Sequence, residues 1–327
     1  MSNPSSRSLG IAALLFATAG WGGMFLVSKG VLHQVDPTWF TLIRYTLSGI
    51  FFVALLLPRG AAPWYKLRAN AAGLALRGVA GFGVFSVMLL AGLAHSVPSH
   101  GAVVIATTPI TTQLLRWALD GVRPTRASIL TALLALAGVA IVAGVLSHGA
   151  HSGVSTLHGD ALTLIGTLGW VAYTRGATRF AELDVIEYTA LTVLASWPLL
   201  LLGAVLATAF GWASVPSADD VLVSWHALLY VGLVSSALAI LAFNFGVRSL
   251  GAVTATAFLN FVPVSALLMS VALGKPPSLS ELIGTAMVIA ALLIHTVTSR
   301  AKQVGFGVSV QTQELLCPPN RYRLTPR

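Results

Sequence analysis

Two stretches of this 327-residue chain share one layout. Residues 9–32 are LGIAALLFATAGWGGMFLVSKGVL, and residues 159–180 are GDALTLIGTLGWVAYTRGATRF. A glycine stands near the start of each stretch, and a Gly-Trp pair follows ten residues later, as Gly20-Trp21 and as Gly169-Trp170. Both pairs lie inside long apolar runs, so the matching layout predicts a unit that the chain contains twice.

Composition places these runs in a membrane. Hydrophobic residues make up 56% of the chain and charged residues 9%, with a mean hydropathy of +0.84. A soluble domain carries about 25% charged residues, and an apolar helix of about 20 residues crosses the ~30 Å hydrocarbon core of a bilayer. The sequence therefore predicts an all-α, polytopic membrane protein in contact with lipid. We expect ten transmembrane helices, at 9–32, 38–57, 71–94, 99–119, 127–147, 159–180, 185–211, 225–249, 252–274 and 279–299.

The expected spans divide into two groups of five around the polar segment 148–158. An odd number of spans makes the second group enter the membrane from the opposite side. Such inverted repeats are typical of secondary transporters, with the substrate site near the membrane midplane between the two halves. We expect a first repeat at 9–147, a second at 159–299, and a polar cytoplasmic tail at 300–327.

The net charge of +9 is unevenly distributed over the expected topology. An excess of Lys and Arg marks the cytoplasmic side of a membrane protein, so we expect both termini in the cytoplasm, the plasma (bacterial inner) membrane as location, and no nucleic-acid partner. Residues 1–19 also resemble a signal peptide, but cleavage there would destroy the match between the halves. One side holds Lys29 and Lys275, and the other holds Arg7, Arg59, Lys66, Arg68, Arg77, Arg116, Arg123, Arg126, Arg175, Arg179, Arg248, Arg300 and Lys302.

Two longer stretches resemble a known family. Residues 11–57, with Trp-Gly in the first span and an arginine in the second, resemble the opening of an EamA domain, and residues 234–294 are similar to the end of a second one. The resemblance covers about residues 9–299 and implies a member of the drug/metabolite transporter superfamily. Where that family often has Gly-Glu after the fourth span of a repeat, this chain has Asp120-Gly121 and Gly274-Lys275, so no role of that glutamate is carried over.

Three residues in the middle of spans are candidates for a central site. Trp21 and Trp170 lie too deep for the interfacial belt where tryptophan is common; they either fill the core or line a cavity. Arg44 lies six residues into its span, about 9 Å deep at 1.5 Å per residue. An arginine inside a span suggests a functional site, where it can bind a carboxylate or phosphate through two hydrogen bonds. Snorkelling of Arg44 to the membrane surface is the alternative.

Further candidates surround two prolines. Pro109 and Pro263 lie at the centres of equivalent spans, where proline frees the carbonyl four residues earlier, here Ile105 or Leu259. We expect either fixed kinks or hinges that line the pathway. Polar or aromatic neighbours in the same spans as these prolines or the tryptophans are expected to bind substrate or to form interhelical hydrogen bonds: Thr108, Tyr173 and Asn260.

Other classes of site are not expected. The linker residues His148, His151, His158 and Asp160 have no spacing typical of a zinc site, so we expect no metal, and no cofactor either. No Ser–His pair, paired aspartates or HExxH helix lies within the spans, which disfavours a membrane-embedded enzyme. No carboxylate lies near the middle of any span, which argues against, without excluding, proton coupling.

The sequence therefore predicts a secondary transporter that moves a small molecule by alternating access. The family resemblance implies export of a small polar metabolite such as an amino acid. An organic-anion or sugar-phosphate exchanger is the alternative, but it would need several cations in the cavity. A channel is a third possibility.

Overall fold

The computed structural model describes residues 4–121, 123–124, 126–142, 153–176, 180, 182–250, 255, 258–259, 261–291 and 293–294. Every regular element in these residues is helical. The first half contains α1 (Pro4–Val31), α2 (Pro37–Leu56), η1 (Leu57–Arg59), α3 (Ala62–Gly78), η2 (Val79–Val84), α4 (Phe85–Ala94), α5 (Pro98–Ala106), α6 (Thr108–Asp120) and α7 (Arg126–Val142). The second contains α8 (Gly153–Gly176), α9 (Val185–Ala209), α10 (Ala218–Val223), α11 (Trp225–Leu229), η4 (Tyr230–Leu238), α12 (Ala239–Leu250) and α14 (Phe261–Ala272).

Several of these helices have the length and composition of membrane spans. Two further helices, Phe261–Ala272 and Leu279–Ala291, are apolar but shorter than these spans. The chain is thus an all-helical membrane protein, as predicted, while the count of ten spans stays a prediction. Five stretches of the described chain are long and apolar enough to cross a bilayer: Arg7–Val31, Pro37–Arg59, Ala62–Ala94, Val185–Ala209 and Trp225–Leu250.

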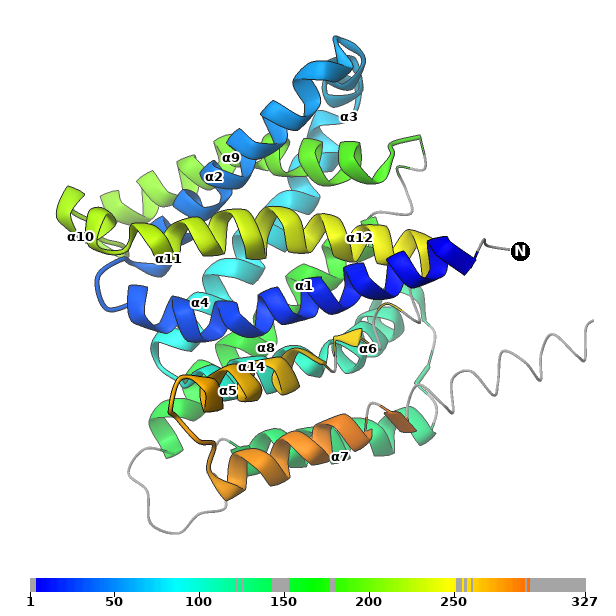
Figure 1. The fold of residues 1–327 in the computed structure, drawn as a ribbon, viewed down its shortest axis with the longest axis vertical. Helices are drawn as coiled ribbons and strands as arrows, with labels where there is room; N and C mark the ends of the chain where they lie inside the picture. Colours follow the sequence, from blue (N-terminus) through cyan, green and yellow to red (C-terminus); the bar gives the residue numbers. More distant parts are fainter. Residues whose placement is uncertain are drawn as a thin grey trace, which may run out of the picture.

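The third span is longer than the sequence predicted. Its apolar run suggested 71–94, but the helix begins at Ala62 and has 33 residues, about 50 Å at 1.5 Å per residue. That exceeds the thickness of the hydrocarbon core, and Figure 1 shows α3 projecting from the rest of the molecule. The added turns are polar, and Lys66 Nζ lies 2.7 Å from the buried carboxylate of Glu187 at the start of α9. This contact stabilises helix where hydropathy alone indicates a loop.

The fourth span is interrupted near its centre. Helix α5 ends at Ala106 and α6 begins at Thr108, with Pro109 in its first turn. Proline lacks the N–H group that a continuous helix would need there, and it fits the first turn of a new helix. In the second half, Pro263 likewise lies in the first turn of a helix, α14.

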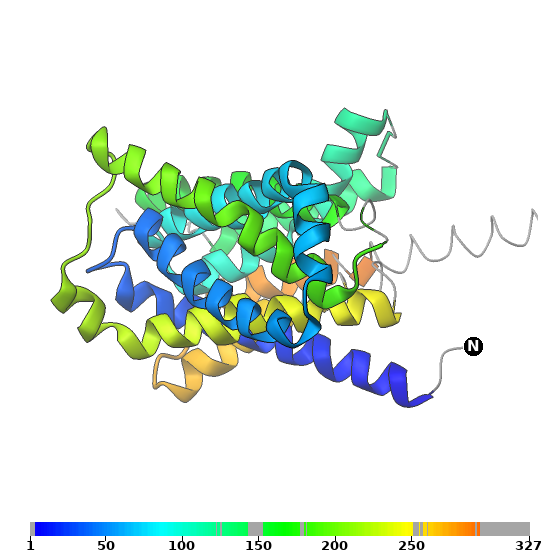
Figure 2. The same cartoon turned by 90° about the horizontal axis from the view of Figure 1, so that it is seen from above.

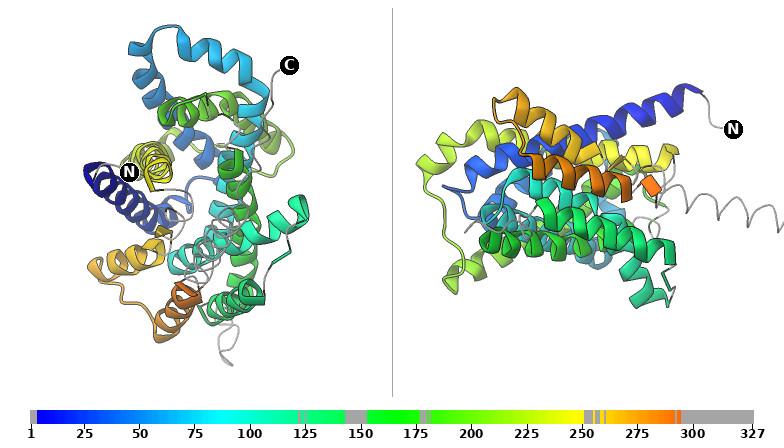
Figure 3. Two further views of the ribbon diagram at one scale, coloured as in Figure 1. Left: turned by 90° about the vertical axis from the view of Figure 1, so that its right-hand side faces the viewer. Right: turned by 90° about the horizontal axis from the view of Figure 1, so that it is seen from below.

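The two halves interlock. Helix α1 packs along α12 and α14 of the second half, and α8 packs against α4, α5 and α6 of the first. In Figure 1, α1 and α12 run side by side across the middle, with α2, α3 and α9 above them and α5, α6, α7 and α14 below. Figure 2 and the end-on view of Figure 3 show the same neighbours. The first span of each predicted repeat therefore packs on the third and fourth spans of the other.

The repeated glycines lie at these helix crossings. A Cβ on Gly159 of α8 would overlap the carbonyl oxygen of Gly92 in α4, and a Cβ on Gly92 would overlap the carbonyl of Gly159. At the α1–α12 crossing, a Cβ on Gly10 would lie 2.9 Å from Cβ of Ser249. Small residues allow helix backbones to approach closely in membranes, which explains why both repeats have a glycine at this position.

Polar contacts distinguish the two ends of the helix bundle. At the basic end, Arg59 pairs with Asp184 and Arg175 with Asp120. At the far end, Lys29 Nζ donates hydrogen bonds to the carbonyls of Leu93, Ala94 and Ser96 at the end of α4. A cation is favoured at a helix C-terminus, so Lys29 links α1 to α4 and does not simply extend into solvent.

His100 and Asp160 also meet at the far end. Asp160 of α8 accepts a hydrogen bond from Ser96 at 2.6 Å and lies 3.1 Å from Nδ1 of His100 in α5. Both side chains are buried. Two of the histidines considered for a zinc site, His148 and His151, lie outside the described residues.

Candidate functional site

The two equivalent tryptophans meet at the centre of the molecule. The rings of Trp21 and Trp170 are 5.7 Å apart with an interplanar angle of 83°, an edge-to-face contact that aromatic rings favour. Phe243 of α12 lies beside both, 5.3 Å from Trp21 and 6.2 Å from Trp170. The repeat inferred from the sequence thus brings its two Gly-Trp pairs to one place.

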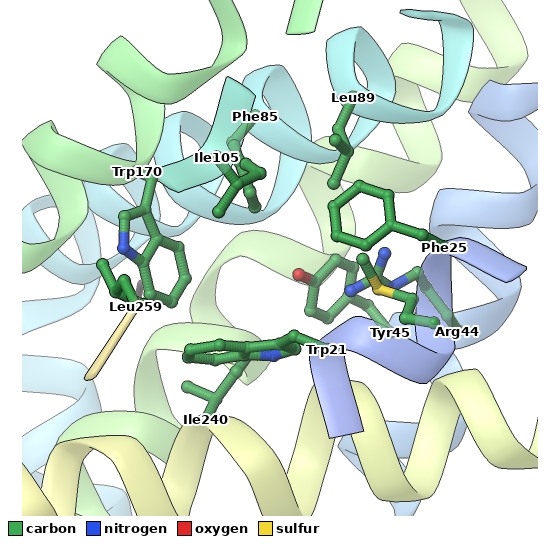
Figure 4. Close-up of a pocket in the computed structure, with 11 residues that line it drawn as sticks. Trp21, Phe25, Arg44, Tyr45, Phe85, Leu89, Ile105, Trp170, Ile240 and Leu259 are labelled. Atoms are coloured by element: carbon green, nitrogen blue, oxygen red, sulfur yellow. The ribbon is translucent and has the colours of Figure 1, made fainter. Parts of the chain in front are cut away.

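A small cavity lies beside this tryptophan pair. It contains about 30 Å³ of free space, enough for one or two water molecules but far below the several hundred Å³ typical of small-molecule sites. Figure 4 shows Arg44 as the one charged side chain in a largely aromatic and aliphatic lining. The lining residues are Trp21, Met24, Phe25, Arg44, Tyr45, Phe85, Leu89, Ile105, Trp170, Ile240 and Leu259.

Arg44 is buried in the cavity wall and does not snorkel to the membrane surface. The residue is only 2% exposed, and its Nε donates a 2.7 Å hydrogen bond to Oγ of Ser236. The guanidinium lies 5.0 Å from the ring centroid of Tyr45, but its Nη1 has no hydrogen-bond partner. None of the ion pairs among the described residues includes Arg44.

A buried guanidinium without a counter-charge is costly, because desolvation is not offset by an ionic partner. The equivalent position in the other half carries no charge. Arg44 is eight residues after Asp36, the N-cap of α2, and eight residues after Asp184, the N-cap of α9, stands Thr192. The hydroxyl of Thr192 donates to the carbonyl of Tyr188 within its own helix. The positive charge is therefore confined to one side of the cavity.

A π-helical segment holds the cavity residues in place, and the sequence did not predict it. Three residues of α1 and α2 bond to η4: Trp21 Nε1 to the Ser235 carbonyl at 3.0 Å, Arg44 to Ser236, and Ser48 Oγ to the Gly232 carbonyl at 2.7 Å. A second π-helical segment, η2, lies in the third span of the first half. π-Helical turns often occur at functional sites. The sequence feature that could have indicated these segments is a pair of small residues at the centre of each third span, glycines in η2 and serines in η4.

Tyr173 lies next to the cavity without lining it. Its ring packs 5.3 Å from Trp170 and 4.8 Å from Phe82. Its hydroxyl accepts a 3.1 Å hydrogen bond from Asn244, whose amide also donates to Thr189. The prediction that Tyr173 contacts the substrate stays a prediction; in this structure its ring packs against Trp170 and its hydroxyl has a protein partner.

The two proline breaks border the cavity. Ile105 and Leu259, the residues whose carbonyls the prolines were expected to free, both line it. The Ile105 carbonyl accepts a hydrogen bond from the Thr108 hydroxyl, and the Leu259 carbonyl accepts one from the Val262 amide at 3.0 Å. Thr108 is therefore engaged with its own chain and is not among the lining residues. Asn260, the remaining predicted site residue, lies outside the described residues.

Comparison with known proteins identifies the family. The profile of the EamA-like transporter family matches residues 8–144 and again residues 157–297. The chain is similar over 92% of its length to a solved crystal structure, of which it covers 99%, with a TM-score of 0.60 and 22% identity. At that identity the likeness concerns the fold alone.

Curated relatives are similar over most of their length. The transporter YrdR of Bacillus subtilis is 30% identical over 89% of this chain and 92% of its own. A Streptantibioticus cattleyicolor protein named a probable terminal-alkyne amino-acid exporter is 27% identical over 88% and 93%. The inner membrane transporter YedA of Escherichia coli K12 is 27% identical over 84% and 87%. Two profile matches and these relatives show that the chain belongs to the EamA-like transporter family.

Proposed function

We propose that the protein exports small polar metabolites such as amino acids by alternating access, with Arg44 binding the carboxylate of the solute. The observation that carries this proposal is the buried Arg44 guanidinium, which faces the cavity with one nitrogen unpartnered. A carboxylate would supply the missing counter-charge and two hydrogen-bond acceptors. Intramembrane charges without a structural partner typically mark substrate pathways.

The lining suggests what the rest of the solute contacts. Trp21 and Trp170 offer aromatic surface to the body of the solute, and Tyr173 supports Trp170 from behind. Thr108 and Asn260 remain proposed polar contacts for a state in which the cavity is wider. A single cation in the lining fits a solute with one negative charge better than the sugar phosphate of an exchanger. The exporter relative from Streptantibioticus supports both the amino-acid class and the direction.

The size of the cavity supports alternating access. About 30 Å³ cannot hold an amino acid, so the halves must separate at one end to admit the solute. Pro109 and Pro263 are the proposed hinges, because the breaks they cause lie beside the cavity where movement would open it. No chemical conversion of the solute is proposed, since the relatives are transporters.

Transport by purified protein tests the proposal. Liposomes containing the protein are loaded with labelled L-leucine or L-phenylalanine, and efflux is compared with that of isoamylamine and phenethylamine, which lack the carboxylate. We expect efflux of at least one amino acid and none of its amine. Equal efflux of acid and amine, or no amino-acid efflux across the full set of twenty, would contradict the proposal.

We predict that Trp21→Ala lowers efflux of the transported amino acid at least about tenfold, because the variant removes a wall of the site and a hydrogen bond to Ser235. Trp21→Phe keeps a ring and should be intermediate. Trp197→Ala is the matched control, since its indole also donates a hydrogen bond, to Thr46, but outside the cavity lining. Equal losses at Trp21 and Trp197, both normalised to folded protein, would argue against a role of Trp21 in the site.

Orientation is a separate proposal. We propose that both termini, and the tail at 300–327, lie in the cytoplasm, because Lys and Arg are in excess at the basic end. We further propose that the repeats, 9–147 and 159–299, have opposite orientations. We expect reporter fusions after Arg59 and after His151 to lie on opposite sides of the membrane, measured as phosphatase against fluorescent-protein activity. Reporters on one side would overturn the inverted repeat.

A further inference from the structure

A second hollow, unrelated to the central cavity, lies on the lateral surface at the basic end. This groove has about 640 Å³ of free space, and none of its lining residues belongs to the central cavity. Its walls are apolar: Leu9, Ala13 and Phe16 of α1, Leu241 and Phe245 of α12, and Ile186 of α9. Leu9 and Phe16 are 59% and 46% exposed. Figure 1 shows that α1 and α12, which supply most of these walls, lie side by side.

The basic end of the groove is charged. Arg59, Asp184 and Arg248 are the charged residues of the lining. Asp184 forms a 2.5 Å ion pair with Arg59. Arg248 donates a hydrogen bond from Nη2 to the Leu183 carbonyl and takes part in none of the ion pairs among the described residues. The rim thus has one more positive than negative charge, at the end of an apolar trough.

We infer that this groove binds an anionic phospholipid, with one acyl chain along α1 and α12 and the headgroup phosphate at Arg248 and Arg59. The exposed apolar walls match an acyl chain, and the rim matches a phosphate at the membrane surface. Basic pockets between membrane helices at the cytoplasmic side are a known mode of lipid recognition. The tail at 300–327 fits the groove poorly, because it carries five Lys or Arg and one Glu and would meet a rim of its own sign. The site is independent of the solute proposed above.

Lipid retention by the purified protein tests the site. The detergent-solubilised protein is titrated with dioleoyl phosphatidylglycerol or dioleoyl phosphatidylcholine, and bound lipid is counted by native mass spectrometry. We expect the wild-type protein to bind the anionic lipid more tightly. Arg248→Gln should lower that preference about fivefold, because one basic residue near the membrane surface contributes about that factor to the binding of an anionic lipid. Arg68→Gln, an exposed arginine of α3 outside the groove, is the matched control and should retain it.

A second pair of variants fills the trough itself. Ala13→Trp should lower retention of both lipids, whereas Ala12→Trp, one residue along α1 and outside the lining, should not. Equal binding of the two lipids by the wild-type protein, or equal effects of the Arg248 and Arg68 variants, would overturn the site. A change from dimer to monomer for Ala13→Trp, with lipid retention unaltered, would mean that a second copy of the chain occupies the groove.

Discussion

Arg44→Gln should reduce transport of a carboxylate-bearing solute by roughly 30- to 4,000-fold in kcat/KM. Removing one partner of a buried, hydrogen-bonded charge pair costs about 2–5 kcal/mol, and each 1.4 kcal/mol corresponds to a factor of ten. Arg44→Lys keeps the charge but loses the planar fork and the bond from Nε to Ser236, so we expect an intermediate value. Efflux from liposomes that contain equal amounts of folded protein is the measurement.

The stability of the same variants separates a substrate contact from a structural role. Arg44 is buried without an ion-pair partner among the described residues, so its removal should leave the melting temperature of the empty protein unchanged or raise it. Ser236→Ala removes the acceptor of Nε together with the bond of this hydroxyl to the Val231 carbonyl, and it serves as the control, with a loss of about tenfold or less. Wild-type transport by Arg44→Gln would exclude a solute contact, and a lower melting temperature would indicate a structural charge.

Gly159→Val should prevent formation of a stable folded protein. Its side chain would overlap the backbone carbonyl of Gly92 where α8 crosses α4, and a backbone atom cannot turn aside as a flexible side chain can. Overpacking costs about 1–3 kcal/mol where neighbours adjust, and we expect a larger loss at this crossing. Gly203→Val in α9 is the matched control, because a Cβ there meets no atom within 4 Å.

The measurement is the yield of monodisperse protein and its melting temperature, from fluorescent fusions in detergent. We expect Gly92→Val to behave like Gly159→Val, since the two glycines contact each other, and Gly203→Val to behave like the wild type. A melting temperature for Gly159→Val within a few degrees of the control would mean that the two halves do not cross at this point as closely as the structure indicates.

The fold class and the duplication follow from local composition. Few charged residues and long apolar runs exclude a water-facing surface, and the spacing of Gly10 to Trp21 recurs at Gly159 to Trp170. Proline chemistry likewise locates the helix breaks at Pro109 and Pro263, because the missing N–H acts within four residues. Arg44 was recognisable as a candidate because any charge inside a span is costly.

The partner and facing direction of each side chain come only from the packed structure. In a bilayer, lipid is as apolar as the protein core, so hydrophobic periodicity does not separate the inward from the outward face of a helix. The sequence therefore did not show that Tyr173 packs against Trp170 and bonds to Asn244. The same limit hid the π-helical turns and the unpartnered nitrogen of Arg44. These features depend on how α1 and α2 meet η4, more than 180 residues away along the chain, and such contacts are decided by the fit of whole helices.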